Sequence, residues 1–507
     1  MRSTFMGLET SKRGLYTQQS ALYTTGHNIS NANTLGYSRQ RVNMQATSGF
    51  PGVGLNAGTM PGFLGTGVEA GSIQRIRDSF IDKQYRNESN QLGYWENRTK
   101  NISQMEDVLA EPSKYGLQGS LSEFWAALQT LANSPENGGA RAVVVERGVA
   151  VADSFKYIDK SLKEIQDNIG QEIGVSVKDI NSIMDQIAGL NKQIAEVEPN
   201  GYLPNDLYDA RDALVDELST YLPIEVKNVP TGGKALAIAE GTLTVKIKTK
   251  NGEITVIEGK DYAKMSVVGG DGEGKPASPS DMESFTFAVE GNASGGPLTV
   301  GNMQESGKLR SLVESFGYPD ENGNVKGLYP DMLKKLDDMA KAFVEEFNKI
   351  HKTGEPLSGT KVNDFFQGNS ASTIEVNAEI QKDPNKFNAS SAAGEAGNGE
   401  IALQLSKFQF NKIEIGGIKD TTIQSFYSGV IGELGVEGQQ AVKMTKNSMT
   451  LLGAVSSRRD SVSSVSLDEE MTDMIRFQQA YNASARMVTV MDETLDKIIN
   501  GMGVVGR

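Results

Sequence analysis

The stretch Thr25-Gly-His-Asn-Ile-Ser-Asn-Ala-Asn-Thr-Leu-Gly-Tyr-Ser-Arg-Gln40 is rich in residues that end helices. Asparagine and glycine tolerate the left-handed backbone conformation and satisfy the free carbonyls at a helix end. The amides of Asn28, Asn31 and Asn33 also offer donors and acceptors for a fixed turn or for a neighbouring subunit. The segment therefore predicts the exit of a helix that starts near the N-terminus.

Apolar residues at a spacing of seven occur before this exit and again near the C-terminus. They are Met1, Leu8, Leu15, Leu22 and Ile29 in the first run, and Leu467, Met474, Tyr481, Val488, Leu495 and Met502 in the second. A strict repeat of this kind keeps one seam facing a partner helix. The companion positions are weaker, because Met471, Ala485 and Ile499 fit the pattern whereas Gln478 and Asp492 do not.

The free-energy balance of such a thin seam is unfavourable for a lone helical hairpin. Burying a leucine-sized residue contributes about 1.5–3 kcal/mol, while ordering each backbone residue costs about 1–2 kcal/mol. An ordinary two-helix hairpin inside a globular fold is the alternative. We expect instead that the two termini pair with each other and with neighbouring copies. The candidate assembly interface consists of Leu8, Leu15, Leu22, Asn28, Ile29, Asn31, Asn33, Gly36, Tyr37, Leu467, Met471, Met474, Gln478, Tyr481, Arg486, Val488, Leu495 and Ile499.

Composition excludes several classes of function. The formal net charge of −14 argues against nucleic-acid binding, which needs clustered lysines and arginines. No window approaches the roughly 18 uninterrupted apolar residues of a membrane span, and the first residues show no secretory signal peptide. The chain has no cysteine and only two histidines, His27 and His351, and it carries no complete catalytic motif. We expect no enzyme activity, no cofactor and no metal.

Two short motifs look like ligand loops and are rejected. Gly269–Pro276 nearly matches a phosphate-binding loop, but Pro276 stands where a hydroxyl is needed, so we expect a surface turn. The segment from Asp320 to Asp331 starts like a calcium loop, but its sixth position is Val325 instead of glycine. For His351, which follows an apolar run, we expect a cation placed favourably at a helix C-terminus.

The rest of the chain consists of predicted helical segments separated by non-helical ones. The segment from Thr34 to Gly71 is too rich in glycine to be a helix, whereas helical periodicity covers 78–109, 141–197 and 205–222. A capping box, Ser120–Glu123, predicts another helix start, and Pro135 ends that helix. Helical patterns return at 333–350 and from about Ile423 to the end, with a partly extended stretch between them.

Between these helical regions lies a block with the alternation of β-strands. Leu243, Val245 and Ile247 alternate with polar residues, and Asn251-Gly252 then marks a hairpin. The length allows roughly three domains. We predict an α+β multidomain fold, with long terminal helices forming a coiled coil, a helical-bundle rod domain and an inserted mainly-β outer domain at the tip of the rod. The ranges are 1–72 with 459–507, 73–223 with 326–458, and 224–325.

Several segments resemble a known family. The Thr25–Gln40 segment resembles the signature of flagellar rod, hook and hook-associated proteins, in the form typical of the hook-associated protein 1 family, although that family usually has proline at the position of Leu35. Leu467–Ile499 is also similar to the family. Tyr208–Leu218 and Val376–Asn-Ala-Glu-Ile380 are features of hook-associated protein 1 that we do not associate with hook protein.

This resemblance implies a structural adaptor that polymerises at the hook–filament junction and is required for filament assembly. It implies an extracellular location on the bacterial flagellum, reached by type III export without a cleaved signal peptide. The implied partners are further copies of the chain, the hook protein, a second hook-associated junction protein and a cytoplasmic export chaperone on the C-terminal helix. The flagellar hook protein itself, or a secreted adhesin acting through the β insert, are the alternatives.

Overall fold

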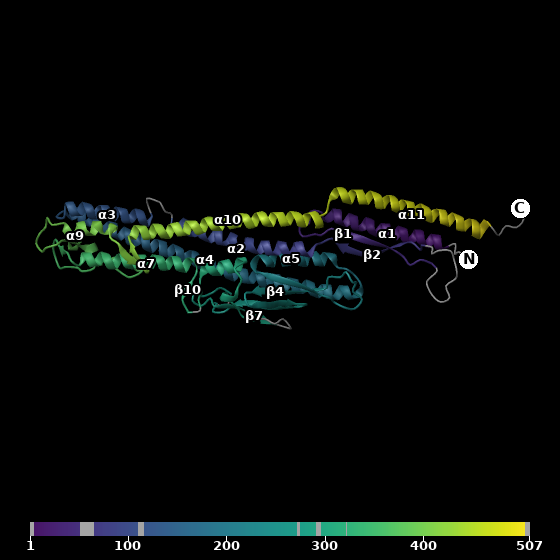
Figure 1. The fold of residues 1–507 in the computed structure, drawn as a ribbon, viewed down its shortest axis with the longest axis horizontal. Helices are drawn as coiled ribbons and strands as arrows, with labels where there is room; N and C mark the ends of the chain where they lie inside the picture. The colour runs from purple at the N-terminus through teal and green to yellow at the C-terminus, as the bar shows by residue number, and fades with distance from the viewer. Residues whose placement is uncertain are drawn as a thin grey trace.

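The computed structural model describes residues 5–50, 65–109, 116–270, 274–289, 296–320 and 322–501. Figure 1 shows a long rod with the first and last helices together at one end. Met1 and Met502, the outermost positions of the predicted repeats, lie outside the described residues. None of the described helices is long and apolar enough to cross a membrane.

The terminal end of the rod consists of two helices and a hairpin. Helix α1 (Phe5–Asn31) packs against α11 (Leu467–Gly501), and α1 also contacts both strands of the antiparallel hairpin β1 (Gln40–Ala46) and β2 (Val68–Arg75). The prediction that the two termini pair is confirmed. The predicted non-helical segment from Thr34 to Gly71 contains β1 and the first half of β2, and its residues 51–64 lie outside the described part of the chain.

The body of the rod is a bundle of long helices. Helix α2 (Ser79–Leu109) lies along α10 (Ile423–Ser463), and the 60-residue α4 (Gly138–Val197) packs against α3 (Leu117–Asn133) and α5 (Asn205–Tyr221). At the far end, α7 (Leu328–His351) and α9 (Glu400–Lys407) enclose an aromatic core with α3, in which Phe124 and Phe347 are fully buried. The helices expected from periodicity are confirmed.

The predicted capping box is wrong. Helix α3 begins at Leu117 with Gly116 as its N-cap, so Ser120 lies inside the helix and its hydroxyl is 2.9 Å from that of Ser154. Leu117 and Leu121 are both buried in the core. Apolar burial therefore starts the helix before the capping motif is reached.

The inserted sheet is a six-stranded antiparallel meander in sequence order. Its strands are β3 (Ile224–Val229), β4 (Thr242–Thr249), β5 (Gly252–Glu258), β6 (Asp261–Val267), β7 (Ser284–Val289) and β8 (Leu298–Thr299). Asn251-Gly252 lies at the turn between β4 and β5, so the predicted hairpin is confirmed. A nine-residue helix, α6 (Lys308–Phe316), follows the sheet, packs against α2 and α4, and was not predicted.

The position of the sheet differs from the prediction. We expected the β insert at the tip of the rod, but Figure 1 shows it on the side of the rod, near its middle. The reason is that α4 runs back from the far end toward the terminal helices before the sheet begins. The far tip is formed by α3, α7 and α9 instead.

Short elements complete the described chain: β9 (Tyr318–Pro319), β10 (Val325–Lys326), β11 (Glu355–Pro356), β12 (Phe366–Gln367), β13 (Glu375–Val376), α8 (Ala378–Lys382), β14 (Asn388–Ser390), β15 (Ile413–Ile415) and β16 (Ile418–Thr421). The calcium-like segment starts in the β9–β10 turn, where Asp320 accepts backbone N–H bonds from Asn322 and Asn324. Residues 271–273 of the phosphate-loop-like turn lie outside the described residues.

The expectation for His351 is wrong. We expected an imidazolium at the end of α7, but the ring is fully buried, and burial lowers its pKa to about 4. It is therefore a neutral core residue at physiological pH.

Candidate assembly interface

The two terminal helices meet along a seam of small residues on α1. A Cβ atom at Gly7 would lie 2.9 Å from the Met491 side chain, and one at Gly14 would lie 3.2 Å from Ser484 Oγ. Further along, the Asn28 amide donates to Glu470 Oε2 over 3.0 Å. Residues nearer the C-terminus of α1 therefore contact residues nearer the N-terminus of α11, so the two helices are antiparallel. Glycine at these positions lets the helices approach closely.

The predicted apolar repeat of α1 lies beside this seam. Leu8, Leu15, Leu22 and Ile29 each follow a seam position by one residue, which turns them about 100° around the helix, and they are half-buried. The buried residues of α1 are instead Thr17, Ala21, Thr24, Thr25 and Asn28. One cause is the hairpin that covers another face of α1, where the Thr17 hydroxyl donates to the carbonyl of Val68 over 3.1 Å.

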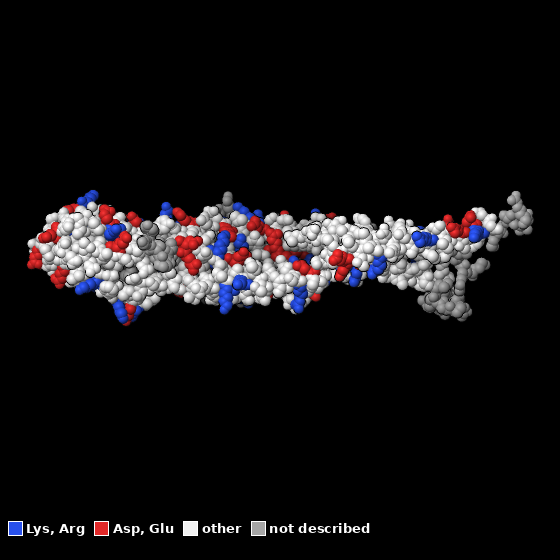
Figure 2. Space-filling view, turned by 90° about the horizontal axis from the view of Figure 1, so that it is seen from above, with Lys and Arg blue, Asp and Glu red and all other residues white. Residues whose placement is uncertain are grey.

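The predicted residues of α11 fall into two groups. Leu495 is buried, and Met474, Tyr481 and Val488 are half-buried. The other five candidates are exposed: Leu467, Met471, Gln478, Arg486 and Ile499. Exposed apolar side chains here, such as Met471 at 55% and Ile499 at 66%, leave part of the helix surface apolar. Figure 2 shows a largely uncharged surface over this helix, and Arg486 is its only charged residue between Phe477 and Met491.

Asn28 is the centre of the exit motif. Its amide nitrogen donates to the Gln40 carbonyl over 2.8 Å as well as to Glu470, and its amide oxygen accepts from the Gln40 N–H and the Tyr37 hydroxyl. All the usual hydrogen bonds of the amide are thus formed in a site that is 1% exposed. Burial, with the nearby carboxylates of Asp206 and Asp209, raises the pKa of Tyr37 well above its usual value, so the hydroxyl stays protonated as a donor.

The rest of the exit motif forms a turn. The Asn31 amide donates to the His27 carbonyl over 3.0 Å, and Gly36 has a φ of 81°, which a glycine adopts without strain. Asn33 is exposed and Leu35 is 99% exposed. The turn therefore holds the predicted helix exit through Asn28, Asn31 and Gly36, and Asn33 lies on its exposed surface.

Arg39 joins the exit motif to the start of α11. Its guanidinium donates to Glu470 Oε1 and to Glu469 Oε2, each over 2.6 Å. Its backbone N–H donates to the carbonyl of Ser463 at the end of α10 over 2.9 Å. One residue therefore ties together the last two helices and the first strand.

A buried ion-pair network connects the β1–β2 hairpin to helix α5, and sequence reasoning missed it. Arg75 of the hairpin pairs with Asp209 at 2.6 Å and with Asp212 at 3.0 Å, and the Ser38 N–H donates to Asp209. Arg459 of α10 reaches the same helix α5 through Asp216 at 2.6 Å. Burial alone would raise the pKa of Asp212, but the surrounding arginines hold it far below its usual value. The only sequence feature that points to this network is the dense charge of the Tyr208–Leu218 segment.

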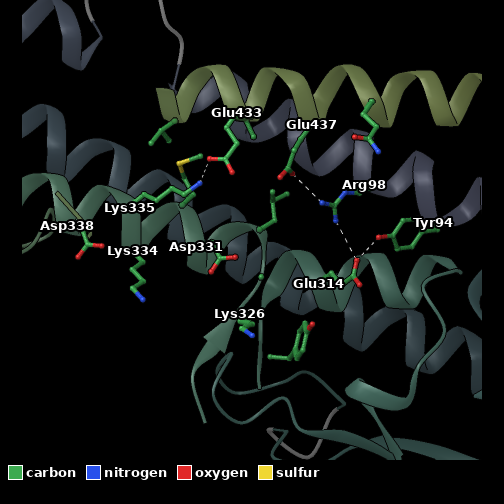
Figure 3. A pocket seen from close by; sticks show the side chains of 18 of the residues that line it. Tyr94, Arg98, Glu314, Lys326, Asp331, Lys334, Lys335, Asp338, Glu433 and Glu437 are labelled. Atoms are coloured by element: carbon green, nitrogen blue, oxygen red, sulfur yellow. Dashed lines mark hydrogen bonds and ion pairs between the residues drawn. The ribbon is translucent and has the colours of Figure 1, made fainter. Parts of the chain in front are cut away.

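A hollow of about 760 Å³ lies elsewhere, between α2, α7 and α10. Figure 3 shows charged side chains that pair with each other across it. Arg98 lies 3.5 Å from Glu314 and 3.3 Å from Glu437, and the Tyr94 hydroxyl donates to Glu314 over 2.6 Å. The Arg98–Glu437 pair joins α2 to α10, and the two contacts of Glu314 join α2 to α6. Within the described ranges, no group of three or more His, Asp or Glu side chains could hold a metal ion.

Similarity to known proteins decides the family. Flagellar hook-associated protein 1 of Bacillus subtilis is 44% identical over 518 aligned residues, which cover all of both chains. The chain belongs to the flagellar hook-associated protein 1 family. A model described as the helical domain of flagellar hook-associated protein FlgK matches residues 102–366, and one described as the C-terminal region of flagellar basal body rod FlgEFG proteins matches residues 457–501.

More distant members agree with this assignment. Hook-associated protein 1 of Escherichia coli is 24% identical over 96% of this chain and 98% of its own length. The solved structure of the flagellar hook junction protein FlgK from Burkholderia pseudomallei is 14% identical, has a TM-score of 0.59, and covers 75% of this chain and all of that one. That structure shows that the fold is shared.

Proposed function

We propose that this chain is a structural adaptor that polymerises at the junction between the flagellar hook and filament and is required for filament assembly. The observation that carries the proposal is the antiparallel terminal helix pair. It is held by its own seam, yet it leaves apolar side chains such as Ile475 and Val490 at least half exposed. Such a surface suits burial against other copies.

The proposal extends to partners and location. The partners are copies of this chain, the hook protein, a second junction protein and an export chaperone on the C-terminal helix. The chain acts outside the cell, on the bacterial flagellum. The predicted division into a terminal unit (1–72 with 459–507), a rod (73–223 with 326–458) and an insert (224–325) goes with it: the terminal unit assembles, and the rod holds it in place.

The hook protein is the second candidate, because the 457–501 segment matches a model named for flagellar basal body rod FlgEFG proteins and not for hook-associated protein 1. The full-length likeness to hook-associated protein 1 favours the junction instead. An adhesin acting through the β insert has no such support.

Deleting the gene separates these functions. We expect cells with intact hooks and no filaments, and filament protein released into the medium, as seen by electron microscopy and immunoblotting. Missing hooks would identify a hook protein. Normal filaments would contradict a structural role at the junction, and restoration by the plasmid-borne gene controls for effects on neighbouring genes.

A further inference from the structure

We propose that Asn28, Glu470 and Arg39 are positioning residues that set the register of α1 against α11. This inference rests on the proposed function only for its biological purpose, since a fixed register is what lets identical copies present identical surfaces. The geometry itself is independent of where the chain assembles.

The small-residue seam does not fix the register by itself. Gly7, Gly14 and Ala21 recur every seven residues and offer nearly the same surface to α11. If α11 slipped by seven residues, Gly14 would face Met491 or Phe477 instead of Ser484. Either arrangement still places a small residue against a side chain of the partner helix, so packing alone distinguishes the registers weakly.

The polar end of the seam distinguishes them strongly. Asn28 and Glu470 are 1% and 2% exposed, and each satisfies the other. In one slipped register Asn28 would face Phe477, and its amide would lose the carboxylate acceptor. In the other, Glu470 would face Ala21 and lose the Asn28 donor. Burying a carboxylate or an amide without its partner is unfavourable, and a single polar residue in a heptad seam is a known way to specify register.

Arg39 ties this register to the rest of the molecule. Its side chain pairs with Glu470 over 2.6 Å, and its backbone N–H, just before β1, donates to Ser463 at the end of α10. Glu470 therefore has to stay beside Arg39 as well as beside Asn28. Only residues 464–466 separate α10 from α11, so the start of α11 is tied to the same end of α10 that Arg39 bonds.

Disulfide trapping tests the register directly, because the natural chain contains no cysteine. A Cβ atom at Gly14 would lie 3.9 Å from Ser484 Cβ, within the roughly 3.5–4.5 Å range of disulfides. The pair Gly14→Cys with Ser484→Cys reports the native register. Gly14→Cys with Phe477→Cys, or with Met491→Cys, reports a slip of seven residues in either direction.

Each cysteine pair is placed in the otherwise natural full-length chain, in Asn28→Ala/Glu470→Ala and in Glu469→Ala. Glu469 also pairs with Arg39, but its side chain is 64% exposed, so its variant is the matched control. Intramolecular cross-links are separated from dimers by gel mobility and mapped by mass spectrometry. We expect the 14–484 link in the natural chain and the control, and a shift of seven residues, to 14–477 or 14–491, in the double variant.

Two results would overturn the proposal. One is a 14–484 link that persists alone in the double variant. The other is the loss of all three links with loss of helical circular dichroism, which would mean that the cluster stabilises the pair without choosing its register. Normal filaments in the deletion strain would refute the proposed function but leave these links, and the register they report, unaffected.

Discussion

His351 shows how one buried side chain makes the stability of the rod depend on pH. Its Nδ1 atom donates to the Asn363 carbonyl over 2.9 Å, and its Nε2 atom accepts the Asn388 N–H over 3.1 Å. The rings of Phe365 and Phe387 lie beside it. Burial lowers its pKa from 6.5 to about 4, so folding excludes a proton that the unfolded chain binds.

The sign of the pH dependence follows from that difference. Between pH 6.5 and pH 4 the unfolded chain is protonated at this residue and the folded chain is not, so stability is lost as the pH falls. From pH 7 to pH 5 we expect His351 to account for a loss of about 2 kcal/mol. Urea unfolding of the natural chain and of His351→Gln at both pH values measures it. Equal losses in both proteins would show that His351 is not responsible.

At the scale of elements, glycine sets how closely helices pack in the rod. A Cβ atom at Gly93 of α2 would lie 2.6 Å from the carbonyl oxygen of Thr220 in α5, which is too close without a shift of backbone. Gly189 of α4 has nothing within 4 Å of the same position. Both glycines lie inside helices, so comparing alanine at the two sites separates the effect of crowding from the effect of helix propensity.

We expect opposite effects of alanine at these two sites. Gly93→Ala should destabilise the rod by about 1–3 kcal/mol because the helices must separate. Gly189→Ala should stabilise it by about 0.5–1 kcal/mol because alanine favours the helix. Thermal unfolding followed by circular dichroism measures both. A stabilising Gly93→Ala would mean that α2 and α5 do not approach as closely as described.

Most elements could be predicted from sequence periodicity, because long helices and the Asn-Gly hairpin have strong local signals. Helix α6 has only nine residues, which is too short a window to show a repeat, although Leu309, Leu312 and Phe316 are all buried. The seam between α1 and α11 was misplaced by one residue. The seven-residue repeat predicts leucine at the seam of α1, whereas close packing of α1 on both α11 and the hairpin favours glycine, alanine and threonine.

At the scale of the whole molecule, the arrangement of the parts could not be predicted. Helix α4 has 60 residues and at about 1.5 Å per residue spans roughly 90 Å. Its direction decides whether the sheet lies at the tip or on the side, and periodicity does not report direction. The exit motif and the Tyr208–Leu218 segment were both singled out, but nothing in either indicates that Ser38 and Asp209 meet.

The proposed function requires the chain to add to the end of the hook through its terminal helix pair. Hooks isolated from the deletion strain can be mixed with purified chain and imaged by electron microscopy with gold-labelled antibody. We expect label at one end of each hook for the natural chain. We expect none for Gly14→Leu, which should separate α1 from α11 while the rod unfolds at the same temperature. Label along the whole hook, no label with the natural chain, or equal end-labelling by Gly14→Leu would contradict the proposed function.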